Sequence, residues 1–345
     1  MKGIVFEKNL GARYLSVDEP EINLPYDVKI RIVASGICGT DLRILAGHFP
    51  ARDGTILGHE AVGIVEALGS QVTSVQLGDR VILDPTLHCG QCRYCQTGRF
   101  NLCDFKAGTE VGVDRNGTFS EFTILPENFV HRIPDEMSFD KALLIEPLAC
   151  VLNNLDAGEA GYQDHVVVLG AGPIGMITAL VAQRFCKDVT VVEKNPQRLQ
   201  FARGKFGRVL DSDRDDFPDF FQKNAPLVDL VIDTTGVLME LGLKLCAKGS
   251  RLVLMGFNNN SRVQINPLEI TMKALRITGA GDYNLKFPKA IEIAALLPLE
   301  ELITHRFALG DFSQAFSALL DINSGKNGEI QKPMMKVVFD FAKGN

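Results

Sequence analysis

The chain contains no block of consecutive lysine and arginine residues, although 36 of its 345 side chains are basic. Its net charge of -6 is mildly acidic, and the basic residues are scattered along the sequence. Proteins that bind nucleic acids concentrate positive charge on one segment or face, so we expect no nucleic-acid partner.

Long apolar runs are also missing at the start of the chain. Residues 1–17 mix charged and polar side chains with apolar ones, which argues against a signal peptide or a membrane anchor and favours a cytoplasmic protein. Internal repeats and low-complexity tracts are likewise absent. With 46% hydrophobic and 23% charged residues, the composition is that of a globular protein long enough for two domains.

The first part of the chain, to about residue 150, is predicted to consist of short strands separated by turns. Alternating or β-rich segments occur at 29–33, 61–68 and 80–83, and glycines stand at the expected bends. This spacing predicts a compact, partly barrel-like β domain.

Strands and helices alternate from about residue 160. Strands are predicted at 165–169, 188–193, 227–233, 251–257 and 277–280, with helices at 174–184, from 196, and at about 237–247. Strands that are apolar on both faces and alternate with helices indicate a doubly wound parallel sheet. A helix at 287–297 follows, and a last strand at 335–341 is expected to return to the first domain.

Four of the eight cysteines lie close together, in a C-x2-C-x2-C-x7-C pattern formed by Cys89, Cys92, Cys95 and Cys103. Four thiolates in a short lobe predict a closed structural zinc site that supplies much of the lobe's folding energy. Disulfides are disfavoured in a reducing compartment, and an iron–sulfur run has a shorter last spacing and a following proline. Isolated cysteines among apolar neighbours are expected to be buried side chains: Cys150, Cys186 and Cys246.

A glycine-rich turn follows the strand at 165–169. Gly170, Gly172 and Gly175 occupy the G-x-G-x-x-G positions. The first glycine permits a tight turn, the second lets a pyrophosphate approach the backbone, and the third lets the helix pack against the strand. Because strand, motif and helix occur in this order, the motif predicts a dinucleotide site.

The acidic residue expected at the ribose is Glu193, which ends the second strand of this sheet. A carboxylate there would repel a 2′-phosphate, so we expect NAD, with NADP less favoured. Lys194 could pair with a phosphate or could be an exposed loop residue, and we favour the exposed lysine. The other predicted cofactor contacts are Pro173, Ile174 and Arg198.

Three separated pieces of sequence suggest a second metal site. Cys38 lies in G-I-C-G-T-D, His59 and Glu60 lie in G-H-E-A-V-G, and Glu146 lies in the apolar stretch I-E-P-L. A core thiol, a surface histidine and a helix-capping glutamate would explain each piece separately. A carboxylate buried in an apolar run needs a partner, however, and a catalytic zinc uses about three protein ligands. Spacing alone leaves both interpretations open.

Taken together, these motifs resemble the zinc-containing medium-chain dehydrogenases/reductases, the group that includes alcohol, sorbitol and threonine dehydrogenases. The resemblance extends over essentially the whole chain. Its matching segments are C-G-T-D at 38–41, G-H-E-A-V-G at 58–63, G-D-R-V at 78–81, the four-cysteine lobe, E-P-L-A at 146–149 and G-A-G-P-I-G at 170–175.

The resemblance implies an α/β fold with two domains and an active site in the cleft between them. Residues 1–152 would form a GroES-like, β-rich catalytic domain with a zinc lobe at about 85–105. A Rossmann domain with a doubly wound parallel sheet would follow at 153–286 and bind NAD, and residues 287–345 would complete the catalytic domain. The resemblance also implies a homodimer or homotetramer that associates through the Rossmann sheets.

The family's zinc ligands correspond to Cys38, His59 and Glu146, so that each subunit would hold two Zn²⁺ ions, one catalytic and one structural. Glu146 occupies a position that is cysteine in liver-type alcohol dehydrogenases and glutamate in the sorbitol and threonine branches. Glu60 would be a direct or alternating ligand. Asp41 would accept a hydrogen bond from the far nitrogen of His59 and thereby orient the ring.

The implied reaction is hydride transfer from a secondary alcohol to NAD⁺, which gives a ketone. Zinc, as a Lewis acid, would lower the pKa of the bound alcohol, and Thr40 would carry away the proton. Arg43 replaces a histidine that ends the proton relay in many relatives. His48 is then a candidate for that step, and Arg43 would favour an acidic or phosphorylated substrate or be a surface residue.

We expect the substrate to be a small-molecule alcohol: a polyol, a sugar alcohol, a sugar acid or a related phosphate. Tyr283 is expected in the substrate pocket, but Asp282 replaces a basic residue of sorbitol dehydrogenases, so sorbitol itself does not follow. One alternative is a non-sugar alcohol such as L-threonine, a small diol or an aminocyclitol. The other is a non-catalytic NAD-binding sensor, in which loss of the zinc-ligand residues would be expected, and none is lost.

Overall fold

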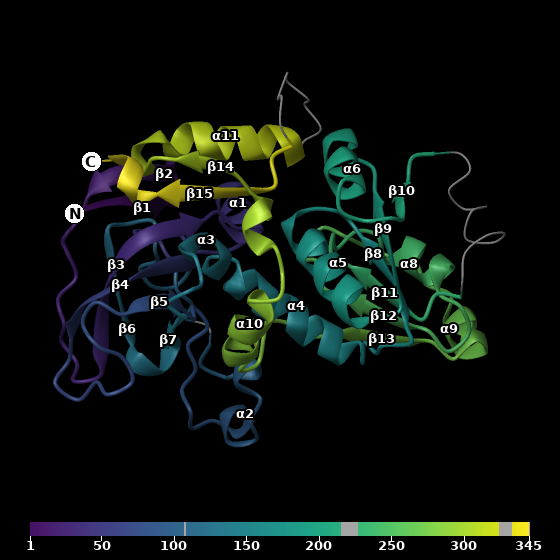
Figure 1. Ribbon diagram of the computed structural model, residues 1–345, viewed down its shortest axis with the longest axis horizontal. Coiled ribbons are helices and arrows are strands. Elements are labelled where there is room, and N and C mark those ends of the chain that lie inside the picture. The colour runs from purple at the N-terminus through teal and green to yellow at the C-terminus, as the bar shows by residue number, and fades with distance from the viewer. Residues whose placement is uncertain (107, 215–226, 324–332, 345) are drawn as a thin grey trace. The chain divides into compact units, whose positions relative to one another are not determined.

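The computed structural model describes residues 1–106, 108–214, 227–323 and 333–344 (Figure 1). Its contacts divide the chain into two compact units. The first comprises Met1–Glu146, Phe287–Ile330 and Lys336–Asn345, and the second comprises Pro147–Lys286 and Gln331–Met335. The division falls inside helix α4 (Ile145–Ala157).

A seven-stranded sheet forms the centre of the first unit. Its order is β14-β15-β3-β4-β5-β7, with β6 also paired to β3. Every pairing is antiparallel except that of β14 with β15. The strands are β3 (Asp27–Gly36), β4 (Glu60–Leu68), β5 (Arg80–Leu83), β6 (Phe122–Pro126), β7 (Val130–Arg132), β14 (Ile303–Phe307) and β15 (Lys336–Asp340). Because β15 pairs with β3, the C-terminal strand belongs to this sheet.

The core of the first unit follows from strand periodicity. Val28, Ile30 and Ile32 alternate along β3 and pack with Val65 of β4 and Val81 of β5 in one buried cluster. Around this sheet lie a two-stranded hairpin, β1 (Lys2–Glu7) with β2 (Gly11–Ser16), and several helices. These helices are α1 (Gly39–Leu45), α2 (Arg93–Gln96), α3 (Phe139–Ala142), α10 (Phe287–Ala294) and α11 (Phe312–Asn323).

The second unit contains a six-stranded, fully parallel sheet with the order β10-β9-β8-β11-β12-β13. Its strands are β8 (His165–Leu169), β9 (Asp188–Glu193), β10 (Val209–Asp211), β11 (Leu230–Asp233), β12 (Arg251–Leu254) and β13 (Arg276–Gly279). Numbered along the unit, this order is 3-2-1-4-5-6, that of dinucleotide-binding sheets. The predicted fold class, a β-rich domain combined with a doubly wound sheet, is confirmed.

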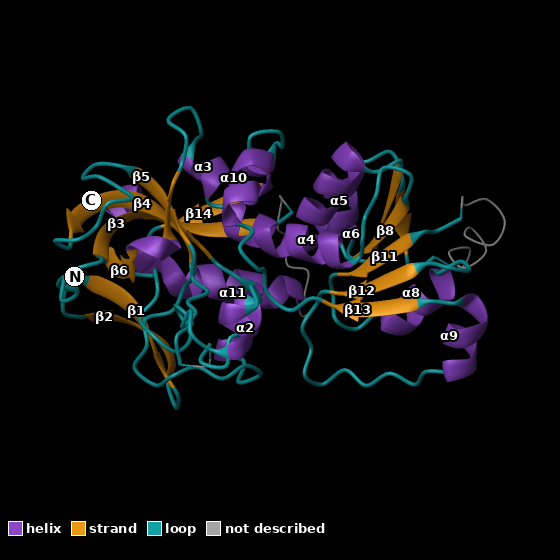
Figure 2. Ribbon diagram, turned by 90° about the horizontal axis from the view of Figure 1, so that it is seen from below, coloured by secondary structure: helices purple, strands orange, loops and turns teal. Residues whose placement is uncertain are grey.

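Helices cover both faces of the parallel sheet (Figures 1 and 2). Helices α5 (Pro173–Phe185) and α6 (Pro196–Arg203) lie on one face, and α8 (Met239–Leu245) and α9 (Pro267–Lys273) lie on the other. Burial on both faces explains why all five residues of β8 are buried and why all but His165 are apolar. Among the described residues, no helix combines the length and the apolar character needed to cross a bilayer.

Several predicted boundaries were wrong by a few residues, since β11 begins at Leu230 rather than at 227 and α10 ends at Ala294 rather than at 297. Strand β12 ends at Leu254 rather than at 257, and helix α8 begins at Met239 rather than at 237. For β12 and α8 the cause is a close approach of two glycines, since a Cβ on Gly256 would lie 2.1 Å from the Gly236 nitrogen. Gly236 also has a positive φ of 76°, so the chain turns here before the helix can start.

A buried polar pair joins strands β8 and β9 of the parallel sheet and can be tested. His165 Nε2 lies 2.8 Å from Thr190 Oγ1, and both residues are at most 2% exposed. Thr190→Val is expected to lower the free energy of unfolding by about 1–3 kcal/mol, because the imidazole nitrogen loses this partner in a dry environment. Urea denaturation would measure the change.

The matched control is Thr178→Val. The Thr178 hydroxyl is equally buried but donates at 2.9 Å to the Ile174 carbonyl within α5, and the helix already satisfies that carbonyl. We expect a loss below about 1 kcal/mol for this variant. Equal losses in the two variants would contradict a specific role of the His165–Thr190 pair.

Candidate active site

The ends of two paired strands bring the separated metal-ligand candidates together. Gly36 ends β3 and pairs with Glu60, the first residue of β4, so Cys38 and His59 lie beside the same end of the sheet. One ligand atom each from Cys38, His59 and Glu60 lie within 4.8 Å of one another. Sulfur, imidazole nitrogen and carboxylate oxygen are the donors that zinc prefers. The residues present therefore fit a zinc ion.

Glu146 lies beside this group, in the first turn of α4, and is 7% exposed. It is not part of the 4.8 Å group, but it is electrostatically linked to it. Burial, followed by the charge of Glu60, raises the pKa of Glu146 to about 8, while His59 lowers it. Two carboxylates buried side by side repel each other, and a cation between them would relieve this repulsion.

The electrostatics of His59 also fit a cation-binding centre. Burial lowers the pKa of His59, but the Cys38 sulfur, which shares a hydrogen bond with the ring, and the Asp41 and Glu146 carboxylates raise it. The net shift is well above the ordinary value. Negative charge therefore dominates the surroundings of the imidazole, and a divalent cation would balance it.

The predicted hydrogen bond between Asp41 and His59 is not formed. Asp41 is fully buried, and its Oδ2 accepts a hydrogen bond of 2.8 Å from the Cys38 backbone amide. Asp41 Oδ1 and His59 Nδ1 both lack a partner among the residues that the structure describes. Only one oxygen of the Asp41 carboxylate therefore closes back onto its own turn. Burial raises the pKa of Asp41.

The remaining predicted residues of this region lie on or just after α1. Thr40 Oγ1 lies 3.7 Å from the Cys38 sulfur. The Arg43 guanidinium folds back over the start of the helix, where its Nη1 would lie 3.6 Å from a Cβ on Gly39. His48 is exposed in the following turn, and its backbone amide donates to the Arg43 carbonyl at 2.8 Å.

Lys336 is a site residue that sequence reasoning missed. It begins β15, is 3% exposed, forms an ion pair with Glu60 and donates a hydrogen bond of 3.0 Å to the Ile37 carbonyl. Burial lowers the pKa of Lys336, but Glu60, Cys38 and Glu146 raise it by more. The available signal was a lysine directly before the apolar run of β15, since a buried ammonium group requires a partner.

The four-cysteine lobe has the geometry of a closed metal site. Ligand atoms of Cys89, Cys92, Cys95 and Cys103 lie within 4.8 Å of one another. Three of the sulfur–sulfur distances are 3.6, 3.9 and 3.9 Å. Four sulfurs bound tetrahedrally at about 2.3 Å from one zinc ion would lie about 3.8 Å apart. Backbone hydrogen bonds, that of Cys95 first, lower the pKa of Cys92 to about 6, which favours the metal-binding thiolate.

In the second unit, the glycine turn joins β8 to α5. Gly170 has a positive φ of 95°, and a Cβ on Gly175 would lie 1.9 Å from the Gly170 carbonyl oxygen. Both positions therefore require glycine. Gly172 precedes the helix, Pro173 and Ile174 form its first turn, and a Cβ on Gly172 would meet nothing closer than Arg198 at 3.8 Å. This open helix N-terminus fits a pyrophosphate.

Glu193 stands next to this turn at the end of β9. Its Oε2 accepts a hydrogen bond of 2.7 Å from the Ala171 amide, and its Oε1 accepts from the Lys194 and Asn195 amides at 2.8 and 2.9 Å. The carboxylate thus fastens the glycine turn to the loop before α6. Burial lowers the pKa of Arg198, while Glu193 raises it. An anion and a cation therefore flank the turn.

Tyr283, the predicted substrate-pocket residue, is only 3% exposed. The segment around it is fastened to α4, because Asn153 donates a hydrogen bond of 2.7 Å to the Asp282 carbonyl and accepts one of 3.3 Å from the Asn284 amide.

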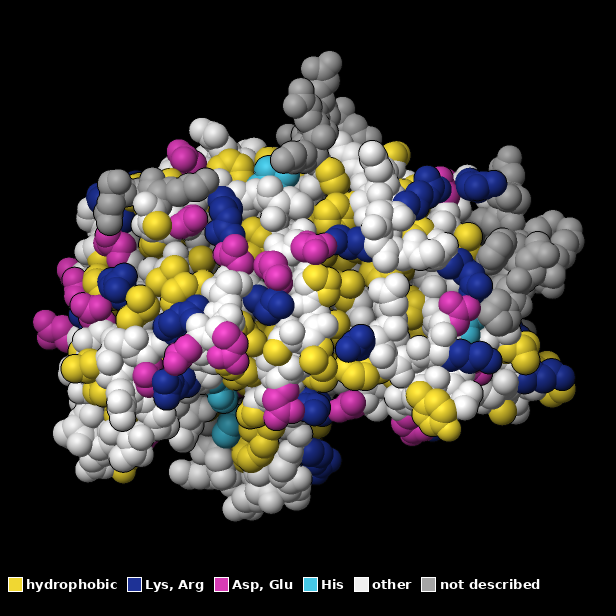
Figure 3. Space-filling model, viewed as in Figure 1, with side chains coloured by type: hydrophobic (Ala, Val, Ile, Leu, Met, Phe, Trp, Pro, Cys, Tyr) yellow, Lys and Arg dark blue, Asp and Glu magenta, His cyan; other side chains and the backbone are white. Residues whose placement is uncertain are grey.

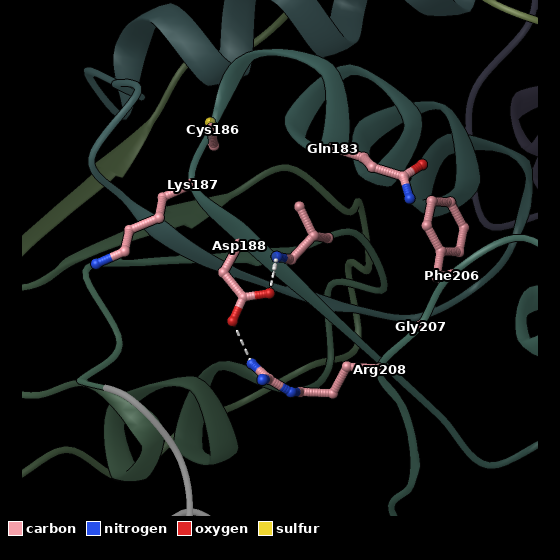
Figure 4. A pocket seen from close by; sticks show the side chains of 8 residues that line it. Gln183, Cys186, Lys187, Asp188, Phe206, Gly207 and Arg208 are labelled. Atoms are coloured by element: carbon pink, nitrogen blue, oxygen red, sulfur yellow. Dashed lines mark hydrogen bonds and ion pairs between the residues drawn. The ribbon is translucent and has the colours of Figure 1, made fainter.

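A hollow of about 300 Å³ lies at the amino end of β9 (Figure 4) and is lined by Gln183, Cys186, Lys187, Asp188, Val189, Phe206, Gly207 and Arg208. Asp188 forms an ion pair with Arg208 across it. Doubly wound sheets bind ligands at the carboxyl ends of their strands, so this hollow lies at the wrong end for the cofactor.

On the face in Figure 3, basic and acidic side chains are interspersed.

One thiol, one imidazole and one carboxylate within a metal-sized group, a four-cysteine lobe and a dinucleotide turn define a zinc- and nucleotide-dependent oxidoreductase. Residues 24–135 match the profile of the family described as "Alcohol dehydrogenase GroES-like domain", and residues 173–295 match "Zinc-binding dehydrogenase". The chain belongs to this family of zinc-binding alcohol dehydrogenases and acts on a CH–OH group.

Similar proteins extend over nearly the whole chain. The chain is 32% identical to the starvation-sensing protein RspB of Escherichia coli K12, covering 99% of this chain and 100% of that protein. It is 34% identical to D-altritol 5-dehydrogenase of Agrobacterium fabrum, covering 85% and 88%. The second of these relatives is a polyol dehydrogenase by name, in agreement with the sequence-based assignment to the polyol branch of the family.

Two solved structures show the same fold. The alcohol dehydrogenase rspB from E. coli CFT073, complexed with NADH, has a TM-score of 0.88 at 29% identity, covering 99% of both chains. Galactitol-1-phosphate dehydrogenase from E. coli has a TM-score of 0.87 at 25% identity, covering 99% of this chain and 100% of that chain.

Proposed function

We propose that the protein oxidises a secondary alcohol of a polyol, a sugar alcohol, a sugar acid or a related phosphate, with NAD⁺ as hydride acceptor and a ketone as product. The observation that carries this proposal is the group of ligand atoms from Cys38, His59 and Glu60, with Glu146 buried beside them. The altritol and galactitol-1-phosphate dehydrogenases among the similar proteins support a polyhydroxylated substrate.

Cys38, His59 and Glu146 would hold the catalytic zinc, with Glu60 next to it. Zinc held there supplies a Lewis acid that lowers the pKa of the substrate alcohol. Asp41 fixes the Cys38 turn through its bond to the backbone amide. The residues of the turn are therefore held in place before metal and substrate bind.

The proton of the alcohol needs a path to water. Thr40 places a hydroxyl 3.7 Å from the Cys38 sulfur, and we assign it the first step of proton transfer. His48 is exposed in the turn after α1 and would pass the proton to solvent.

Arg43 supports substrates that carry an acidic group. Among the described residues it has no carboxylate partner, and it is only partly exposed. Its guanidinium folds toward the start of α1, close in sequence to Cys38 and Thr40. Guanidinium groups bind carboxylates and phosphates in a bidentate manner, which suits a sugar acid or a sugar phosphate.

The cofactor assignment rests on the glycine turn and on Glu193. The open N-terminus of α5 would receive the pyrophosphate, and Tyr283 would contribute to the substrate pocket. Glu193 would accept hydrogen bonds from the adenosine ribose while keeping its bonds to backbone amides, because each carboxylate oxygen can accept more than one. This charge favours NAD over NADP.

A second zinc ion in the four-cysteine lobe would be structural. The described cysteines form no disulfides, and thiolates that bind metal persist in a reducing compartment. We therefore assign the protein to the cytoplasm.

The protein is further proposed to form a homodimer or homotetramer through its parallel sheets. Strand β13 is the last strand of its sheet among the described residues, and an edge strand can pair with a second chain. Helix α9 beside it exposes 63% of Leu268 and 71% of Met272. Light scattering should give a mass of two or four subunits, and a mass of one subunit would contradict this arrangement.

Cys38→Ala tests the catalytic metal. NADH formation at 340 nm from a panel of polyols, sugar acids, sugar phosphates and L-threonine should fall by at least about a thousandfold, because the Lewis acid is lost. NADH binding, measured by fluorescence, should persist. Zinc content should fall from about two ions to about one per subunit, the lobe's ion being retained.

The matched control is Cys186→Ala, which removes a half-buried thiol of the second unit and should leave turnover and zinc content unchanged. Full activity in Cys38→Ala would refute the metal assignment. If the wild-type enzyme oxidised only L-threonine, the proposed substrate class would be wrong, but the proposed zinc-dependent hydride transfer would still hold.

Glu193→Ala tests the coenzyme site. The Michaelis constant for NAD⁺ should rise by about tenfold or more, and discrimination against NADP⁺ should weaken, because the ribose loses an acceptor and the 2′-phosphate loses a repelling charge. Asp188→Ala, at the opposite end of the same strand, is the control and should change neither value. An unchanged coenzyme preference in Glu193→Ala would remove Glu193 from the ribose site.

A further inference from the structure

Lys336 is a buried lysine to which the proposed function gives no role. Its side chain is 3% exposed and contacts Glu60 and the Ile37 carbonyl, one residue before Cys38. Burying an ammonium group is costly unless it is paired. A lysine kept at this position is therefore expected to act on the groups that surround it.

The Glu60 carboxylate has two competing partners. One of its oxygens belongs to the metal-sized group with Cys38 and His59, and Oε2 pairs with Lys336. If Glu146 binds the metal as well, a direct bond from Glu60 would give four protein ligands. Closed sites with four ligands are structural, whereas catalytic zinc sites have three and keep one position open. The partner that holds Glu60 therefore decides whether the site is open.

The sheet is built so that Lys336 reaches Glu60. Gly36 pairs with Glu60 on one side and with Val338 on the other, so β3 lies between the strands that carry the two charges. A Cβ on Gly36 would lie 2.7 Å from Glu60 Oε2 and 2.8 Å from Lys336 Cε. The ion pair thus crosses β3 at Gly36, because glycine has no side chain that would occupy this space.

We propose that Lys336 is a positioning residue that holds the Glu60 carboxylate off the catalytic metal ion and thereby keeps one coordination position open for the alcohol. The inference rests on the proposed function, because it requires a metal ion at Cys38, His59 and Glu146. It assigns to Glu60 the role of a held carboxylate rather than that of a permanent ligand.

The test uses the full-length enzyme with cobalt(II) in place of the catalytic zinc, because the visible spectrum of cobalt reports its ligands. Imidazole, a neutral ligand, is titrated as a probe of the open position. In Lys336→Met, Glu60 is released and joins the metal, so the dissociation constant for imidazole should rise by at least about tenfold. Release of metal to a chelator should slow by a similar factor.

Two variants separate this effect from the loss of a charge or of stability. Lys336→Met combined with Glu60→Gln removes both charges and should restore imidazole binding to the wild-type value. Lys141→Met breaks a partly buried pair with Glu300 in the same unit, where the atoms lie 3.5 Å apart, and should have no effect. If Lys336→Met acted only through the loss of the lysine charge, the rate of metal release would change, but imidazole would still bind at the open coordination position.

Unchanged imidazole binding in Lys336→Met would overturn the inference. If Lys336→Met does not fold, the Glu60→Gln variant provides the test. If Glu60 is held off the metal, the cobalt spectrum of this variant should equal that of the wild type. If Glu60 is a permanent ligand, the spectrum should change. A wild-type protein that binds no cobalt outside the cysteine lobe would instead refute the proposed function itself. The two failures are therefore distinguishable.

Discussion

Buried negative charge at the start of β4 is the constraint on which the site depends. Asp41, Glu60 and Glu146 are 0, 2 and 7% exposed, and the Cys38 thiol lies next to them. Carboxylates cannot remain buried and ionised without compensation. Lys336 supplies part of it, and a divalent cation would supply the rest. The cluster is thus a cation site because of its charge as well as its geometry.

Both units use the ends of strands to hold their polar groups. In the first unit, Cys38 follows β3, Glu60 begins β4 and Lys336 begins β15. In the second, the glycine turn follows β8, and Glu193 ends β9 with three hydrogen bonds to backbone amides. Strand ends are rigid because the ladder fixes them, yet the side chains there leave the sheet. This arrangement positions reactive groups without flexible loops.

Much of the second unit could be predicted from the sequence. The bounds of β8 and β9 were predicted correctly, as was the glycine turn, because strand, turn and helix are neighbours in sequence and obey local rules. Boundaries were wrong where Gly236 meets Gly256, since that contact joins two segments about twenty residues apart. The predicted bond from Asp41 to His59 is not formed in the structure, in which Asp41 Oδ2 accepts from the Cys38 amide and Oδ1 has no partner among the described residues.

By itself the sequence determined which donors are available: four closely spaced thiols, the C-G-T-D and G-H-E motifs and the glycine turn, whose spacing is set by local geometry. Only the tertiary structure decided how the donors meet. It brought Glu60, rather than Glu146, into the tight group with Cys38 and His59, and it placed Lys336 on Glu60 across β3. Lys336 also bonds the Ile37 carbonyl, 299 positions away, and the pairing register of the strands, which no local pattern encodes, produces these contacts.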